Sequence, residues 1–445
     1  MRKTFLASAA FIGMAATCSA WSLDLVRAYQ AALQNDAQFQ AALRERDAGL
    51  QYQEIGRSNL LPVLQWSYSD SQNKLTRTQD ILGKSVTDSP DYRSQSNVLS
   101  LRQPLVNFEG LARYRQGVAQ TSQSLATFDV QANALAIRLM EAYANVLFTK
   151  EQVALTQAEL NSLREVMKAN EAMWKKGEST RTDVLETRSR YLISEAQFLE
   201  AQASLDFAQR QLEGIAGDEV RSEFENMRGP RQDFTLRPLL PATIEEWQQL
   251  AHDNNPDIRA LRHAMEAARQ DMERSRAGHL PRLDLVASVS RSLSETVNTI
   301  NQRLNNQSTG VQLTLPLYSG GAVSATSQQT AANYEKSQAL LNAKINEVMV
   351  DLRKQFNQIR TGGTRIEALK EAVDSAENLV IAVRKSITGG QRVNADLLNA
   401  MQQLHTVKKD QAQARLSYLQ AWLRIKAHTG LVDEQDMEQI AAYFR

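Results

Sequence analysis

The sequence contains a single cysteine, Cys18, among its 445 residues. It lies within residues 1–20, which begin with Arg2 and Lys3, continue with a short apolar stretch and end in small residues at Ala20. This order is typical of a secretory signal peptide that is removed from the mature protein. A retained anchor and a lipid-modified Cys18 are the alternatives. Without residues 1–20 the chain has no thiol, which excludes disulfides, thiolate catalysis and cysteine metal ligands.

The chain also lacks a charge excess and a long apolar run. Without residues 1–20 it carries 49 basic and 50 acidic side chains, and this balance argues against nucleic acid as a partner. Beyond Ala20 no stretch reaches the ~18 apolar residues of a membrane helix. The five histidines form neither an HExxH pattern nor a metal-spaced cluster. We therefore predict that the protein is not an enzyme and holds no metal or cofactor.

Proline is scarce, and two long stretches have none. All nine prolines avoid residues 105–229 and 317–445. Apolar residues in both stretches recur in steps of three and four, which is typical of a coiled coil. A helix over residues 111–176 would be roughly 100 Å long. Gly362 and Gly363 interrupt the second series, and we expect a kink or a break there. The two series are Leu125, Phe128, Ala132, Leu135, Leu139, Ala142 and Val146, and Leu341, Ile345, Val348, Leu352, Phe356 and Ile359.

The sequence repeats itself at about half its length. Residues 174–188 read WKKGESTRTDVLETR and residues 387–401 read ITGGQRVNADLLNAM, which places Gly177 and Gly390 213 positions apart. The Leu-Pro pairs that end at Pro62 and Pro281 are 219 positions apart. These echoes indicate an internal duplication. The predicted organisation is a signal peptide (1–20), a first repeat (21–229), a linker (230–242), a second repeat (243–430) and a short C-terminal tail (431–445).

Each repeat has the same predicted order of elements. A helix, 24–58 or 243–277, ends at the Leu-Pro pair. Two strands with a polar loop between them follow, because apolar and polar residues alternate there with a period of two. The long helix comes next, and the echoed turn reverses it into a helix at 183–215 or 396–427. We expect one face of the strands to be apolar, and its members are Leu64, Trp66, Tyr68, Leu99, Leu101, Leu283, Leu285, Val289, Val311, Leu313 and Leu315.

Four amphipathic strands cannot form a stable membrane structure within one chain. An open sheet leaves edge groups without hydrogen bonds, and lipid cannot satisfy them. One closed barrel shared by several chains removes the edges, and three chains would supply about twelve strands. A secreted chain with such strands and no membrane helix favours the bacterial outer membrane. The same alternation also fits a small soluble sheet, which stays open as an alternative.

The order of these motifs resembles the TolC family of outer-membrane channel proteins. The resemblance runs from about Ser22 to Met437 and rests on the Leu-Pro pairs, on QPLV and LPLYSGG before the long helices, and on the paired Gly-to-Asp turns. It implies a mainly α fold with a membrane β-barrel part. Long antiparallel coiled-coil helices form a periplasmic tunnel, and four strands per chain contribute to a shared trimeric 12-stranded barrel. RTDVLETRSRY is most similar to members that serve type I secretion.

The resemblance also implies a gate at the helical tips, which are the two echoed turns at residues 174–188 and 387–401. In the family an Arg of the second tip is tied to a Thr-Asp pair of the first, and acidic residues ring the aperture. These roles fall on Arg392, on Thr182 with Asp183, and on Asp396. The second acidic position falls on Asn399, so one ring is lost. From the residues alone, Arg392 and Asp396 also fit an ordinary pair four positions apart on a helix.

These observations predict a passive export duct in the outer membrane, with its helical part in the periplasm. The implied partners are two further copies of the chain, a periplasmic adaptor, an inner-membrane ABC transporter, a secreted protein substrate such as a protease or lipase, and outer-membrane lipid. A multidrug efflux channel is the first alternative. A soluble periplasmic coiled-coil scaffold is the second.

Overall fold

The computed structural model describes residues 24–231 and 239–444. The expected signal peptide and Cys18 lie outside this range. The helices are α1 (Leu25–Asn35), α2 (Ala37–Gly49), α3 (Gln51–Ser58), α4 (Phe108–Lys175), α5 (Arg181–Ala216), α6 (Ile244–Asn254), α7 (Pro256–Arg276), α8 (Ala322–Thr388), α9 (Asn394–Thr429) and α10 (Glu434–Ala441). The strands are β1 (Val63–Lys74), β2 (Arg77–Ile81), β3 (Lys84–Asp88), β4 (Asp91–Val106), β5 (Arg282–Leu293) and β6 (Arg303–Thr314).

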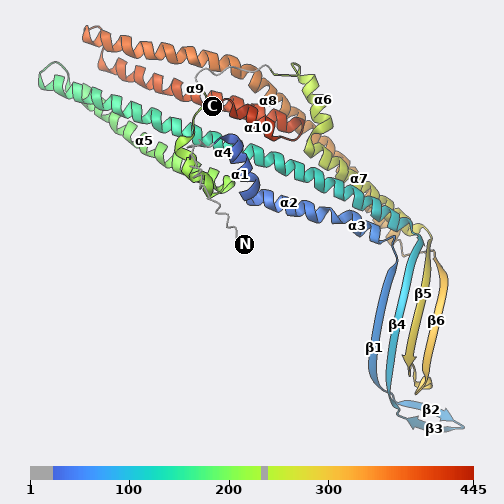
Figure 1. Cartoon of the computed structure of the whole chain (residues 1–445). Helices are drawn as coiled ribbons and strands as arrows, with labels where there is room; N and C mark the ends of the chain where they lie inside the picture. The colour runs from blue at the N-terminus through green and yellow to red at the C-terminus, as the bar shows by residue number, and fades with distance from the viewer. Residues whose placement is uncertain (1–23, 232–238, 445) are drawn as a thin grey trace, which may run out of the picture.

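The molecule is elongated, with a sheet at one end and two helical hairpins at the other (Figure 1). Strands β1, β4, β5 and β6 form an antiparallel sheet in that order. The helices beside the sheet keep the same order, since α3 packs on α4, α4 on α7 and α7 on α8. Further along, α4 pairs with α5 and α8 with α9. The duplicated sequence thus builds two equivalent units side by side.

The two predicted entry helices are each divided. Residues 24–58 form three helices instead of one, and the first break lies at Asp36, whose carboxylate accepts from the amide of Phe39 at 2.7 Å as an N-cap. The second repeat breaks at the equivalent Asn255, whose side-chain oxygen accepts from Ile258 at 3.1 Å. Asp and Asn compete with the helix backbone in this way and start a new helix. The expectation of single helices is therefore wrong.

The predicted long helices are confirmed as α4 and α8; of the kink or break expected at Gly362 and Gly363, the break is absent. Helix α8 is continuous across both glycines. A Cβ at Gly362 would lie 3.1 Å from a ring carbon of Tyr418 in α9. Glycine here lets an aromatic ring approach the helix backbone closely. The glycine reflects packing between α8 and α9 and not a break in the helix.

The strands are longer than the alternating segments predicted. β1 and β4 pair over twelve positions, from Val63 with Arg102 to Lys74 with Asp91. The polar loop expected between them contains a second hairpin, β2 with β3, which extends beyond the main sheet (Figure 1). Its sequence alternates less clearly than β1, and this is why the pattern did not reveal it.

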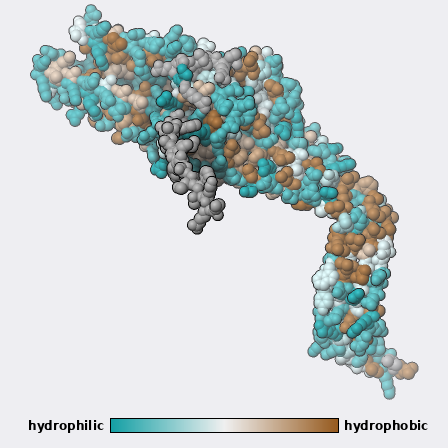
Figure 2. Space-filling model, in the orientation of Figure 1, coloured by the Kyte–Doolittle hydropathy of each residue, from teal (hydrophilic) through white to brown (hydrophobic). Residues whose placement is uncertain are grey.

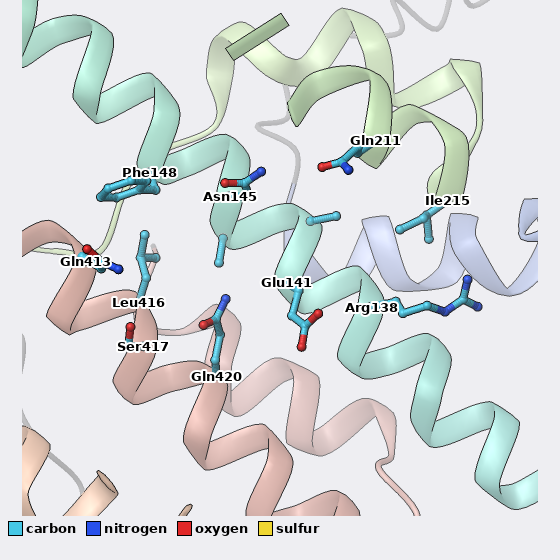
Figure 3. A pocket seen from close by; sticks show the side chains of 12 residues that line it. Arg138, Glu141, Asn145, Phe148, Gln211, Ile215, Gln413, Leu416, Ser417 and Gln420 are labelled. Carbon is cyan, nitrogen blue, oxygen red and sulfur yellow. The ribbon is translucent and has the colours of Figure 1, made fainter. Parts of the chain in front are cut away.

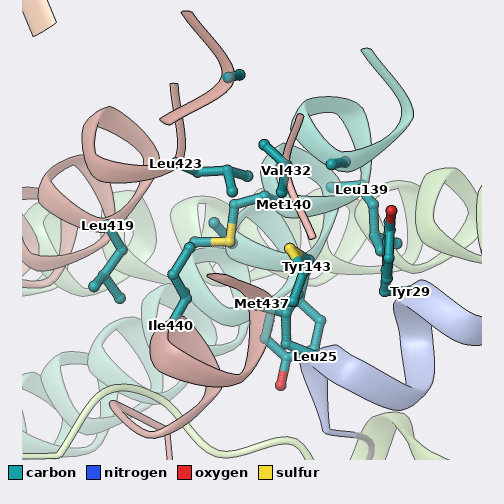
Figure 4. Close-up of a cluster of buried hydrophobic side chains, with 14 of the residues drawn as sticks. Leu25, Tyr29, Leu139, Met140, Tyr143, Leu419, Leu423, Val432, Met437 and Ile440 are labelled. Carbon is teal, nitrogen blue, oxygen red and sulfur yellow. The ribbon is translucent and has the colours of Figure 1, made fainter. Parts of the chain in front are cut away.

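The main core lies where both repeats meet, midway along the helices. It buries side chains of α1, α4, α5, α9 and α10, many of them fully. Figure 4 shows Met437 and Ile440 of α10 packed among Tyr143, Leu25 and neighbouring residues. The rings of Tyr143 and Phe444 meet edge to face at 5.5 Å. The segment after Gly430 is therefore part of this core.

Asn133 fastens α4 to the connection between α9 and α10. Its side-chain amide donates to the carbonyls of Ala427 at 3.0 Å and Gly430 at 2.7 Å, and its oxygen accepts from the amide of Val432 at 2.9 Å. The side chain is buried, so Asn133→Ala would leave three backbone groups without a hydrogen-bond partner and away from water. We expect the free energy of unfolding to fall by about 3 kcal/mol, which circular dichroism would detect as a lower midpoint of thermal unfolding. Asn161→Ala, at an exposed position of α4, is the control; equal midpoints for the two variants would contradict this role.

Candidate functional site

Two turns reverse the long helices at the end of the molecule farthest from the sheet. Gly177 and Gly390 adopt positive φ angles of 77° and 70°, which glycine tolerates best. In each turn the amide after the glycine, that of Glu178 or Gln391, donates at 2.9 Å to a carbonyl five residues earlier. The same hydrogen-bond pattern closes both helices. The echoed sequence therefore encodes the same local structure twice.

Asp183 and Thr180 cap the start of α5. One carboxylate oxygen of Asp183 accepts from the Thr180 hydroxyl at 2.7 Å, from the Thr180 amide at 3.1 Å and from the Ser179 hydroxyl at 3.1 Å. These hydrogen bonds, led by that of the Thr180 hydroxyl, hold the pKa of Asp183 below its usual value. Thr182 lies beside it on the exposed first turn. The capping box holds the tip rigidly in its own hairpin.

The second tip is held less firmly. Val393 occupies the position of Thr180 and has no side-chain oxygen to cap α9. Asp396 accepts from the Val393 amide only at 3.5 Å. Arg392 and Asp396 approach to 3.7 Å, as a pair four positions apart. Within the described chain, Arg392 thus pairs with Asp396, while the carboxylate of Asp183 is taken up by its own turn.

Other residues join the two hairpins near the tips. The buried hydroxyl of Thr187 in α5 accepts from Asn170 of α4 at 2.8 Å and from Asn394 of α9 at 3.0 Å, and donates to the carbonyl of Asp183 at 2.8 Å. All of its hydrogen-bonding capacity is used. This hydroxyl ties both helices of the first hairpin to the second.

Two more contacts follow along α9. Arg190 of α5 donates to Gln402 at 2.6 Å and to Asn399 at 3.3 Å. His405 lies 3.2 Å from the carboxylate of Glu159 in α4. Burial raises the pKa of Glu159, and the nearby His405 and Arg190 oppose that shift. Asn399, which stands at the family's second acidic position, therefore accepts a hydrogen bond between the hairpins.

A small apolar cluster supports these polar contacts. It joins α4, α8 and α9 through Leu163, Val166, Val383, Leu397, Leu398, Ala400 and Met401. Sequence reasoning missed the polar contacts around it. No motif marks them, because partners such as Arg190 and Gln402 become neighbours only through helix packing.

At the other end, the strand register brings the predicted apolar residues to one face of the sheet. Leu64 pairs with Leu101, Trp66 with Leu99, and Leu99 with Val289 on the next strand. On the far side Leu283 pairs with Leu313, and Leu285 with Val311; Leu315 lies just past β6. Apolar residues cover the half of the sheet nearest the helices (Figure 2). Most of these side chains are exposed, including Trp66 at 65% and Leu313 at 67%.

A recess lies near the middle of the molecule. It has a volume of about 540 Å³ and lies between α4, α5 and α9 (Figure 3). Its lining includes Gln211, Gln413, Ser417, Gln420 and a few apolar side chains. Its two charged residues, Arg138 and Glu141, pair with Asp36 and Arg424. We assign the tips and the sheet as the functional parts.

Two further findings concern residues 24–231 and 239–444. No helix in these ranges combines the length and the apolar character needed to cross a membrane. They also contain no group of three or more His, Cys, Asp or Glu side chains placed to hold a metal ion.

Comparison with known proteins decides the family. The sequence model described as "Outer membrane efflux protein" matches residues 28–218 and 247–431. The chain belongs to this outer membrane efflux protein family. Relatives include the alkaline protease secretion protein AprF of Pseudomonas aeruginosa, 41% identical and covering 96% of this chain and 88% of AprF. The proteases secretion protein PrtF of Dickeya chrysanthemi is 37% identical and covers 96% of this chain and 92% of PrtF.

Family membership places the protein at the outer membrane. The fold agrees with that of solved outer-membrane proteins. The outer membrane protein VceC of Vibrio cholerae superposes with a TM-score of 0.77 at 17% identity, covering 91% of this chain and 96% of VceC. The mainly helical architecture with antiparallel strands predicted from the sequence is thereby confirmed.

Proposed function

We propose that this efflux-family protein is the outer-membrane exit duct of a type I secretion system that passes unfolded proteases or lipases. The observation that carries this proposal is the near full-length similarity to two proteins named for protease secretion, at 41% and 37% identity. An inner-membrane ABC transporter would supply the energy and a periplasmic adaptor would join the two. The chain itself would act as a passive conduit.

The sheet supports a barrel shared between chains. Strands β1 and β6 are its two edges, and both are exposed along nearly their whole length. With four antiparallel strands, β1 and β6 run in opposite directions, so β6 of one chain can pair antiparallel with β1 of the next. Repeating this step closes a ring without edges, and three chains give about twelve strands. Residues 283–289 of β5 would span about 20 Å of the lipid.

The helices have matching free edges. In the tip-proximal region α5 and α8 are the outermost helices, because α5 packs on α4 and α8 on α9. On α5, Leu185, Leu192 and Leu199 recur every seven residues and are 52–60% exposed. On α8 at the same level, exposed Ala368, Ser375 and Ala382 also recur every seven residues and lie opposite the buried Val373. A row of leucines on one edge and a row of small residues on the other favour side-by-side packing of copies.

The tips would close the duct. We infer that Arg392, Thr182, Asp183 and Asp396 surround the aperture where three copies meet. Asn399 faces Arg190 and would add no charge there. Contacts between exposed polar groups are weak, at ~0–1 kcal/mol each, so an adaptor with competing contacts could open the end. This reversible closure suits a duct that must stay shut between export events.

A secretion assay tests the proposed function. Deleting the gene in its host should reduce extracellular protease activity to background and leave protease antigen inside the cells. Complementation with the intact chain should restore secretion, whereas a variant that cannot assemble should not. Sensitivity to toxic compounds, measured in the same strains, tests the efflux alternative that the family description suggests. Unchanged secretion combined with increased drug sensitivity would replace the proposed function by efflux.

A further inference from the structure

The polar face of the sheet is almost free of charge. The register places small hydroxyl and amide side chains there, in rows such as Gln65, Ser100, Ser288 and Ser308. Because the opposite face is apolar, this face lines the bore in the proposed barrel. Its serines are Ser67, Ser69, Ser71, Ser94, Ser96, Ser100, Ser288, Ser290, Ser292 and Ser308.

Three charged residues interrupt this face, all at its helical end. Arg102 of β4 and Arg282 of β5 both donate to Asp284, at 2.6 Å and 3.1 Å. The carboxylate of Asp284 is fully buried, whereas the two guanidinium side chains are 49% and 36% exposed. One carboxylate thus serves two cations, and an excess positive charge faces the bore.

The surrounding groups do not cancel this charge. Arg102 and Arg282 line a hollow of about 690 Å³ at the junction of sheet and helices, beside Ser100 and Ser288. The further ionic side chains of its lining, Arg113 and Glu109, pair with each other at 2.7 Å. Each chain therefore contributes about one unbalanced positive charge to this level of the bore.

We propose that Arg102 and Arg282 form a cationic collar that binds the carboxylates of acidic polypeptide segments passing through the duct. This inference rests on the proposed function and names the chemistry of its cargo. A guanidinium has five N–H donors, so each arginine keeps donors free after contacting Asp284. Arg also matches a carboxylate with two parallel hydrogen bonds. A neutral bore in a low-dielectric wall concentrates the field of the remaining charges.

The buried Asp284 is what makes the collar suited to transport. It holds both arginines in place and partly neutralises them, so a passing carboxylate is attracted but not retained. Conduction through a pore requires binding that is favourable enough for entry and weak enough for exit. The section beyond the collar carries no charge, and its hydroxyl and amide side chains outnumber its apolar members, Val98, Leu304 and Tyr92, so it gives an unfolded chain little surface to which it would adhere.

Block of single-channel current tests the collar. Purified full-length trimers in planar bilayers are exposed to poly-L-glutamate from the side of the barrel mouth, so that the polymer reaches the collar before the helical tips. The quantity measured is the polymer concentration that halves the current. This concentration should be about tenfold higher for Arg102→Gln than for the wild type, since the substitution removes one charge per chain. Arg282→Gln removes the same charge while leaving the pair of Arg102 with Asp284, and serves if Arg102→Gln fails to fold. Arg102→Lys, which keeps the charge, should retain most of the block.

Arg291→Gln is the matched control, because Arg291 lies on β5 but on the opposite, apolar face. It should be blocked like the wild type. Equal block of wild type, Arg102→Gln and Arg282→Gln would overturn the collar while leaving the duct intact. A failure of all preparations to form channels would instead contradict the proposed function.

Discussion

Replacing Arg190 and His405 together by alanine should open the closed end of the duct and raise its open probability by roughly 100-fold. The change removes the contacts of Arg190 with Gln402 and Asn399, and that of His405 with Glu159. These contacts join the second hairpin to the first within each chain. At ~0.5 kcal/mol for each of the two side chains removed, the loss over three chains amounts to about 3 kcal/mol. Single-channel recording of the reconstituted variant measures the effect.

The matched control for this prediction is Arg188→Ala. Arg188 is an exposed cation on α5, two residues before Arg190, and has no contact with α9 among the described interactions. It should conduct like the wild type. If the double variant assembles normally and its conductance is unchanged, the closure depends on contacts between chains and not on these links within a chain.

Assembly of the trimer should fail when charged residues replace leucines in the exposed row on α5. In Leu192→Asp with Leu199→Asp, two carboxylates would have to be buried at each interface between copies. Burial of a leucine contributes about 1.5–3 kcal/mol, and burial of an unpaired carboxylate costs more than that gain. We expect the trimer to be replaced by monomer in detergent, as measured by light scattering. The same variant should not restore protease secretion.

Both leucines point away from α4, so the monomer itself should keep its fold. Ser194 and Ala201, which lie on the opposite side of α5, are among the buried residues of this helix. Gln202→Asp adds a carboxylate at an exposed position off the leucine row and should leave the trimer intact. A stable trimer of the double variant would show that α5 is not at the interface.

The overall architecture could be predicted because its signals are local and repeated. Pro62 and Pro281 end helices by sterics alone, and the alternation around Trp66 marks a strand wherever it occurs. The duplication gave each signal twice, as in the turns at Gly177 and Gly390. Pattern, period and turn chemistry all point to the same fold.

The remaining features depend on packing between distant segments, which a single sequence does not display. The division of the entry helices is a local feature instead: Asp36 and Asn255 cap new helices, and Pro256 after Asn255 is a helix-start signal that the sequence reasoning did not use. Gly362 resembles a helix breaker until Tyr418 is placed against it. At the tips, Arg392 and Asp183 were expected from the resemblance, whereas Thr187 and Arg190 emerged only once α5 and α9 lay side by side.

The most direct test of the account is the conductance of the purified wild-type protein in a planar bilayer. Our interpretation predicts insertion of a detergent-stable trimer and small, discrete and stable current steps, because the barrel is open but the helical tips hold the duct nearly closed. A well-folded preparation that never inserts, or that stays in the aqueous fraction without detergent, would contradict the account. The protein would then be a periplasmic scaffold, and its strands would form a soluble sheet.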